Sequence, residues 1–286
     1  MSPEISIVIP AKNEYAGLKK ILPEIHKLYP DYNVIIVDDG SNDETEKVCN
    51  DYGVTLLRHP YSKGNGAAIK TGARSSKSDL TVFMDADGQH NPKDIKKLLD
   101  KIEHGFDMVV GARSTSSQAS VGRLCANTVY NFFATIIVGQ KVEDLTSGFR
   151  VVKTKYFRQF LHLLPNGFSY PTTCTMAFFR TGYSVGYVPI ETNKREGKSH
   201  IKIFKDGVRF LLILFKIGTL YSPLKIFFPA SLLFFSVGIF YYLYTYLTEG
   251  RFTNMSALLL STSIIIFLMG LISEQITSLI YSDNKE

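Results

Sequence analysis

Hydrophobic positions follow two different patterns over roughly the first hundred residues. Short apolar runs, typical of buried strands, are separated by longer stretches with helical spacing. The predicted strands are 5–9, 34–37, 54–57, 80–84 and 108–110. The predicted helices include 15–28, one with Ser41 and Glu44 as a capping box, and one opened by Pro92. Strands that alternate with helices predict an α/β fold, a mostly parallel sheet flanked by helices.

The C-terminal part has a different pattern. No charged residue occurs from Ile226 to Leu247 or from Phe252 to Ser273. A helix needs roughly 20 apolar residues to cross the hydrocarbon layer of a membrane. We therefore predict a transmembrane hairpin of two helices rather than two buried helices of a soluble protein, because uncharged runs of this length are rare in globular cores.

A third apolar segment precedes this hairpin. Within it, Lys205, Arg209 and Lys216 fall on nearly one helical face, which predicts an amphipathic helix at the membrane interface. The predicted organisation is a globular domain at 1–200, an interfacial helix at 201–222 and the transmembrane hairpin at 223–281.

The distribution of basic residues predicts the orientation in the membrane. The far-side turn carries only Arg251, which Glu249 offsets, and Met1–Ile9 has no signal-peptide pattern. The positive-inside rule therefore places the globular domain in the cytosol, at a bacterial or archaeal cell membrane or the ER membrane. The basic residues before the first span are Lys194, Arg195, Lys198, Lys202, Lys205, Arg209, Lys216 and Lys225.

Composition narrows the partners. The net charge of +6 fits an anionic membrane surface and phosphate ligands better than nucleic acid, because no basic motif is interleaved with aromatic residues. The three cysteines are scattered and form neither a disulfide framework nor a zinc-binding spacing.

The strongest candidate chemistry follows the fourth predicted strand, in the sequence from Asp85 to His90. In parallel sheets, functional residues gather at the carboxyl ends of strands. Asp85 and Asp87 can approach one ion, and hard oxygen ligands of this kind suit Mg²⁺ or Mn²⁺ bound partly by phosphate oxygens. The alternative is an acidic turn that caps the next helix, which explains one aspartate but not two together with Gln89 and His90.

Two further turns are weaker signals. A carboxylate of Asp38–Asp39 could accept hydrogen bonds from a base or ribose, although Asp-Gly-Ser is also ordinary turn chemistry. Lys63–Gly66 opens a helix and could approach a phosphate through backbone amides. The chain contains neither the dinucleotide-binding fingerprint nor a Walker A loop, which argues against dehydrogenases and P-loop NTPases.

Five motifs occur in order along the chain, namely Pro10–Glu14, Val37–Ser41, Lys63–Gly66, Asp85–His90 and Thr146–Arg150. Together they resemble the family 2 glycosyltransferases, in particular the branch of dolichol-phosphate mannose synthases and polyprenyl-phosphate glycosyltransferases. The resemblance covers the whole chain. It implies an A-type nucleotide-sugar glycosyltransferase fold and inverting transfer of a hexose from a UDP- or GDP-sugar to undecaprenyl or dolichyl phosphate on the cytosolic face.

The resemblance also implies which residues form the site. Mg²⁺ or Mn²⁺ would bind Asp85, Asp87 and Gln89, and Asp85, Asp87, Arg113 and Arg123 would be catalytic. Donor contacts would come from Pro10, Ala11, Asn13, Glu14, Val37, Asp39, Lys63, Gly66, Asp85, Ala86 and Asp87. Acceptor contacts would come from Arg113, Arg123, Asn127, Arg195, Lys198 and Ser199.

The chemistry of the acceptor supports the arginine assignment independently. A lipid phosphate needs cationic partners, and the guanidinium fork suits its oxygens. A phosphate monoester has a second pKa near 6 and is mostly ionised at neutral pH, so it needs no catalytic base. His90 is therefore expected to be structural.

Two alternatives stay open. A processive polysaccharide synthase would carry a Gln-x-x-Arg-Trp motif, and the chain has no tryptophan. A catalytically inactive membrane scaffold would be expected to have lost part of the acidic cluster.

Small residues in the two spans, Ser231, Gly238 and Gly270, would allow a homo-oligomer. The sugar and the base remain undetermined.

Overall fold

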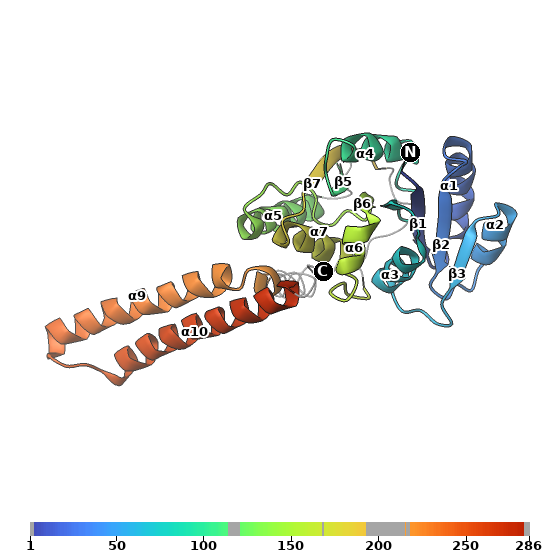
Figure 1. The fold of residues 1–286 in the computed structure, drawn as a ribbon. Helices are drawn as coiled ribbons and strands as arrows, with labels where there is room; N and C mark the ends of the chain where they lie inside the picture. Colours follow the sequence, from blue (N-terminus) through green and yellow to red (C-terminus); the bar gives the residue numbers. More distant parts are fainter. Residues whose placement is uncertain (1–2, 114–120, 168, 193–214, 216–217, 283–286) are drawn as a thin grey trace. The chain divides into compact units, whose positions relative to one another are not determined.

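The computed structural model describes residues 3–113, 121–167, 169–192, 215 and 218–282; for 121–126 and 282 it describes the backbone alone. The chain divides into two compact units, Met1–His200 and Ile201–Glu286, and each is described by itself (Figure 1). The predicted interfacial helix at 201–222 lies mostly outside the described residues.

The first unit contains a seven-stranded mixed sheet with the order β3-β2-β1-β4-β6-β5-β7. All neighbouring strands are parallel except β6, which is antiparallel to both β4 and β5. The predicted α/β fold is therefore confirmed, whereas β6 and β7 have no predicted counterpart. The strands are β1 (Ile5–Ala11), β2 (Asn33–Asp38), β3 (Thr55–Arg58), β4 (Leu80–Phe83), β5 (Met108–Arg113), β6 (Arg150–Lys153) and β7 (Val185–Ile190).

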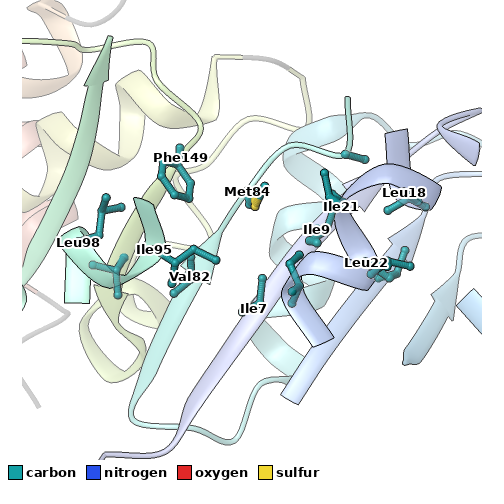
Figure 2. Packing of buried hydrophobic residues seen from close by; sticks show 14 of the residues in the cluster. Ile7, Ile9, Leu18, Ile21, Leu22, Val82, Met84, Ile95, Leu98 and Phe149 are labelled. Carbon is teal, nitrogen blue, oxygen red and sulfur yellow. The ribbon is translucent and has the colours of Figure 1, made fainter. Parts of the chain in front are cut away.

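Strand β1 lies between β2 and β4 and is mostly apolar on both faces, because helices cover both sides of the sheet. Ile7 and Ile9 belong to the buried cluster that includes residues of α1 (Tyr15–Leu28) and α4 (Asp94–Ile102) (Figure 2). On the other face, Val8 packs against Gly72 of α3 (Asn65–Ser75). A side chain on Gly72 would collide with the side chain of Val8. Glycine at this position therefore lets α3 approach the sheet closely.

Four more helices lie in the described part of the first unit. Phe157 of α6 (Thr154–Gln159) packs on Phe83, with ring centroids 4.6 Å apart. The residues of α7 (Tyr170–Arg180) are buried from Tyr170 to Phe178. Helix α5 (Val121–Val138) exposes an apolar face. The remaining helix is α2 (Thr45–Asp51). The exposed face of α5 consists of Val129, Phe132, Phe133 and Ile136.

The predicted capping box at Ser41 and Glu44 is wrong. Helix α2 begins at Thr45, and Ser41 Oγ instead accepts a hydrogen bond from Asn13 N at 2.9 Å. Asp43 serves the start of two helices, because its carboxylate accepts from Thr45 N at 3.1 Å and from Tyr15 N at 3.0 Å. Ser41 therefore connects the loop after β2 to the loop after β1 and does not cap α2.

The second unit contains a helical hairpin, α9 (Leu224–Glu249) and α10 (Asn254–Ser282), which confirms the two predicted apolar helices. By length and composition, both could cross a membrane. Ser231 Oγ and Ser263 Oγ each donate to the other residue's carbonyl at 3.0 Å, so the two helices are joined by reciprocal hydrogen bonds.

The small residues of the hairpin lie between its own helices. Gly238 packs against Leu259 and Leu260, and a Cβ on Gly270 would lie 2.7 Å from Phe227 Cβ. At the start of α9, Glu274 Oε2 accepts from Leu224 N at 3.4 Å, which satisfies a backbone N–H that has no partner within its own helix.

Asp107 joins the starts of β5 and β7 to the end of β6 and offers a test of the sheet. It accepts hydrogen bonds from Lys153 Nζ at 2.8 Å and from Ser184 N at 2.9 Å. Burial alone would raise the pKa of Asp107, but the bonds from Lys153 and Ser184 outweigh it and lower this pKa. The ionised carboxylate therefore stabilises the fold above its unfolded pKa, and this contribution is lost as the pH falls through the folded pKa.

We predict that Asp107→Asn lowers the free energy of unfolding by about 1–2 kcal/mol at pH 7. The difference from wild type should shrink below about pH 3.9, where the unfolded aspartate protonates, and vanish below the folded pKa. Thermal unfolding of the detergent-solubilised chain between pH 7 and pH 3 measures both effects. The exposed Asp51→Asn serves as the control, and a pH-independent difference for Asp107→Asn would contradict the prediction.

Candidate active site

A cavity of about 630 Å³ lies at the carboxyl ends of β1, β2 and β4. This is the edge where loops of parallel strands converge. Its volume is in the range of small-molecule sites. It is lined by Pro10, Ala11, Lys12, Glu14, Asp39, Ser62, Gly64, Asn65, Ala68, Asp85, Ala86, Asp87, Gln89, Arg113, Thr146, Gly148, Gly167, Tyr170 and Pro171.

The acidic turn after β4 is held from two sides by glycines. A side chain on Gly17 of α1 would collide with the carbonyl of Ala86, so the helix backbone contacts the turn directly. On the other side, a Cβ on Gly148 would lie 2.9 Å from Asp85 Oδ2. Within the turn, Gln89 N donates to Asp87 Oδ1 at 3.0 Å. These contacts leave the turn little freedom to move.

The electrostatics of this turn suit a cation. Burial and the neighbouring charge of Asp87 raise the pKa of Asp85, against the opposing effects of His90, Arg113 and Arg150. Asp85, Asp87 and Gln89 all line the cavity and offer oxygen ligands, so this donor set fits Mg²⁺ or Mn²⁺. Among the described residues, no group of three or more His, Cys, Asp or Glu could hold a metal. The remaining ligands of such an ion would be amide, water or substrate oxygens.

Arg113 reaches the cavity from the end of β5 as one half of an ion pair. Its Nε and Nη2 donate to the two oxygens of Asp144 at 2.8 and 3.0 Å, and Nη2 also contacts Thr146 Oγ1 at 2.5 Å. Burial would raise the pKa of Asp144, but the guanidinium of Arg113 lowers it. Arg113 is therefore rigidly oriented.

Behind the cavity lies a fully buried arginine, Arg150. Its Nη1 donates to the carbonyl of Pro171 at 3.0 Å and to Thr175 Oγ1 at 3.1 Å, and its Nη2 donates to the carbonyl of Ser147. The guanidinium carbon lies 5.9 Å from the ring centre of Tyr170. In the described part of the chain no carboxylate forms an ion pair with Arg150, so its charge acts on Asp85 at longer range. It also ties the 146–148 loop to the start of α7.

His90 is buried and stacks on Phe149, with ring centroids 4.9 Å apart. Its Nδ1 has no hydrogen-bond partner among the described residues. The ring of His90 therefore packs behind the acidic turn and is not among the residues that line the cavity, which agrees with the structural role expected for it.

The Lys63–Gly66 segment lies partly at the cavity and partly against another segment of the chain. Gly64 and Asn65 line the cavity, whereas Ala67 N donates to the carbonyl of Asn166 at 3.1 Å. A side chain on Gly64 or Gly66 would collide with the carbonyls of Asn166 and Pro165, respectively. These glycines therefore allow a close crossing of two protein segments, and the predicted phosphate contact at this helix start stays a prediction.

Nine of the predicted site residues line the cavity, namely Pro10, Ala11, Glu14, Asp39, Asp85, Ala86, Asp87, Gln89 and Arg113. Asn13, Val37, Lys63, Gly66 and Asn127 are not among the lining residues. Val37 is fully buried in the core, and Asn13 Oδ1 accepts from Asn42 N at 2.8 Å. Arg195, Lys198 and Ser199 and the side chain of Arg123 lie outside the described residues.

Several lining residues were not predicted. Thr146 and Gly148 belong to the Thr146–Arg150 motif, whose residues have no predicted contact, and Ser62 directly precedes the Lys63–Gly66 motif. Tyr170 and Pro171 carry no signal in the sequence, because only the packing of α7 brings them to the cavity. Asp144 and Arg150, which orient the site from behind, were also missed.

Comparison with known proteins bears on this site. Residues 6–161 match glycosyl transferase family 2, and residues 222–279 match the GtrB C-terminal hairpin. The chain is 34% identical over 157 residues to an uncharacterized protein of Methanocaldococcus jannaschii, covering 51% of this chain and 63% of that protein, less than two thirds of its length.

A second relative matches more of the chain. The polyprenol monophosphomannose synthase of Mycolicibacterium smegmatis is 29% identical over 210 residues, 66% of this chain and 77% of the synthase. Glucosyl-3-phosphoglycerate synthase from Mycobacterium tuberculosis, solved with Mn²⁺, UDP and glucosyl-3-phosphoglycerate, shares the fold with a TM-score of 0.59. That match has 20% identity and covers 74% of this chain and 80% of the other.

The contact between Gly17 and the acidic turn generates a test. In an exposed helix, replacing glycine with alanine would stabilise by about 1 kcal/mol. At Gly17 the added methyl group meets the backbone of Ala86, so we predict that Gly17→Ala destabilises by about 1–3 kcal/mol. Denaturant unfolding measures the sign.

Gly167→Ala is the matched control for this substitution. A Cβ at Gly167 meets nothing within 4 Å, so the change should stay within about 0.5 kcal/mol. A Gly17→Ala protein more stable than wild type would contradict the proposed close contact.

Proposed function

Because the chain belongs to glycosyl transferase family 2, we propose that it transfers a hexose from a UDP- or GDP-sugar to a polyprenyl phosphate, undecaprenyl or dolichyl. The observation that carries the proposal is one cavity that contains both the acidic turn, Asp85 and Asp87, and the oriented Arg113. The same chain ends in a hairpin of membrane length. The hairpin match and the relative named a polyprenol monophosphomannose synthase support a lipid phosphate as acceptor.

In this mechanism the acceptor brings its own nucleophile. A phosphate oxygen attacks the anomeric carbon, the bond from that carbon to the diphosphate oxygen breaks, and the nucleoside diphosphate leaves with the electron pair. No proton has to move, because the acceptor phosphate is already ionised near neutral pH. The attack from the opposite side inverts the anomeric centre.

The residues of the cavity position the two phosphate groups. Arg113 would hold the acceptor phosphate, since Asp144 fixes the direction of its guanidinium. Bound at Asp85, Asp87 and Gln89, Mg²⁺ or Mn²⁺ would supply positive charge to the leaving diphosphate. Arg123, Arg195, Lys198 and Ser199 remain proposed acceptor contacts.

We further propose that residues 1–200 form a cytosolic catalytic domain, 201–222 an interfacial helix and 223–281 a two-span hairpin. Support comes from the division of the chain near residue 200 and from the many basic residues that precede Leu224. The exposed apolar face of α5 fits the boundary between lipid headgroups and acyl chains. A polyprenyl phosphate would then reach the site from the bilayer.

Asp87→Ala should reduce transfer by about a hundredfold or more, because the leaving diphosphate loses its charge stabilisation. The assay is release of UDP or GDP that depends on added polyprenyl phosphate, with radiolabelled nucleotide sugars to identify the donor. His26→Ala and His162→Ala should keep wild-type activity, since both histidines are exposed outside the cavity. Full activity of Asp87→Ala would refute the metal model.

Chelation with EDTA should abolish activity, and added Mn²⁺ should restore it.

Arg113→Lys should raise the KM for the acceptor by about tenfold. Lysine cannot form the paired hydrogen bonds to Asp144 that orient the guanidinium toward the acceptor phosphate. Binding of the nucleotide should be nearly unchanged. Arg74→Lys, an exposed arginine away from the cavity, is the control. An unchanged acceptor KM in Arg113→Lys would remove Arg113 from the acceptor site.

A further inference from the structure

A buried histidine links three segments beside the cavity. His59 follows β3 and is 5% exposed. Its Nδ1 lies 2.7 Å from Asp39 Oδ1, and its Nε2 lies 2.9 Å from Thr71 Oγ1 on α3. The backbone N of His59 donates to the carbonyl of Asp38 at 2.8 Å. The ring is therefore fixed at both nitrogens and through its own backbone.

The Asp39 carboxylate has all its acceptor positions in use. Oδ1 also accepts from Lys63 N, and Oδ2 accepts from Ser62 Oγ and Gly64 N, each at 2.8 Å. Burial would raise the pKa of Asp39, but the four hydrogen bonds, first of all the one with His59, lower it. One carboxylate thus fixes the whole 62–64 loop.

This loop forms one wall of the cavity. Asp39, Ser62 and Gly64 are lining residues, and Lys12 Nζ donates to Ser62 Oγ at 3.0 Å. The loop is confined from the other side, where Gly64 contacts the carbonyl of Asn166 without space for a side chain. A change in the direction of Asp39 would therefore move the wall.

The strand order indicates which part of a donor this wall would meet. The acidic turn follows β4 and Asp39 follows β2, with β1 between them. Two strand spacings are about 9–10 Å. This distance suits a nucleotide that has its diphosphate at the acidic turn and its nucleoside over Pro10 and Ala11, against the 62–64 loop.

We propose that His59 is a positioning residue for the donor nucleoside: it orients Asp39, which holds the 62–64 loop as a preformed wall of the nucleoside site. The inference rests on the proposed function, since it requires a nucleotide-sugar donor. His59 touches no reacting atom, so its effect is on binding of the donor rather than on the chemical step.

The test compares His59→Ala, His59→Asn and Thr71→Val in the full detergent-solubilised chain. Calorimetry with UDP and GDP gives the nucleotide affinity, and steady-state kinetics give kcat and both KM values. His59→Ala should weaken binding of the preferred nucleotide about tenfold and raise the donor KM equally, with kcat and acceptor KM within about twofold. His59→Asn should recover most of the affinity, because its amide can still donate to Asp39. Thr71→Val should cost about twofold to threefold.

The exposed His104→Ala is the matched control and should bind nucleotide like wild type. Unchanged nucleotide affinity in His59→Ala overturns the inference while leaving the proposed function intact, and so does an equal loss in donor KM, acceptor KM and kcat. If His59→Ala does not fold, Thr71→Val decides, and a folded Thr71→Val protein that binds the nucleotide like wild type overturns the inference. A wild-type chain that binds neither UDP nor GDP overturns the proposed function and this inference together.

Discussion

A short turn after β4 holds two carboxylates beside the cavity, and the neighbouring segments fix that turn closely. Gly17 of α1 contacts the backbone of Ala86, and Gly148 of the 146–148 loop contacts Asp85, each without space for a side chain. Burial, and to a smaller extent the charge of Asp87, raises the pKa of Asp85. A cation bound at this turn would relieve both effects. This is a pre-organised arrangement, in which the fold rather than the ligand brings the like charges together.

The cations around the turn are divided by function. Arg113 is oriented by Asp144, whose negative charge offsets part of its field in the cavity. Arg150 is fully buried, has no carboxylate ion-pair partner among the described residues, and holds backbone in place by donating to carbonyl and hydroxyl oxygens. The site thus combines one arginine that faces the cavity with another that acts through the surrounding structure.

The sequence predicted the parts of the molecule that depend on local pattern. Helix 15–28, the first five strands and the two apolar C-terminal helices follow from periodicity and composition, and the residues after β1, β2 and β4 follow from strand polarity. Contacts between distant segments were not predictable. Gly66 was predicted as a donor contact, and its missing side chain also allows a close crossing with Pro165, which no local pattern reveals. Ser41 has the spacing of a cap, yet it bonds to Asn13, which is close only in the folded chain.

Arg150 marks the register of β6. Successive side chains of a strand face opposite sides of the sheet, so Phe149 and Val151 join the apolar cluster while Arg150 donates to Pro171 and Thr175 of α7. A slip of one residue would bury the guanidinium among aliphatic side chains and remove its acceptors, at a cost of several kcal/mol. Arg150 therefore favours the native register of β6 over a register shifted by one residue, in addition to holding the 146–148 loop near α7.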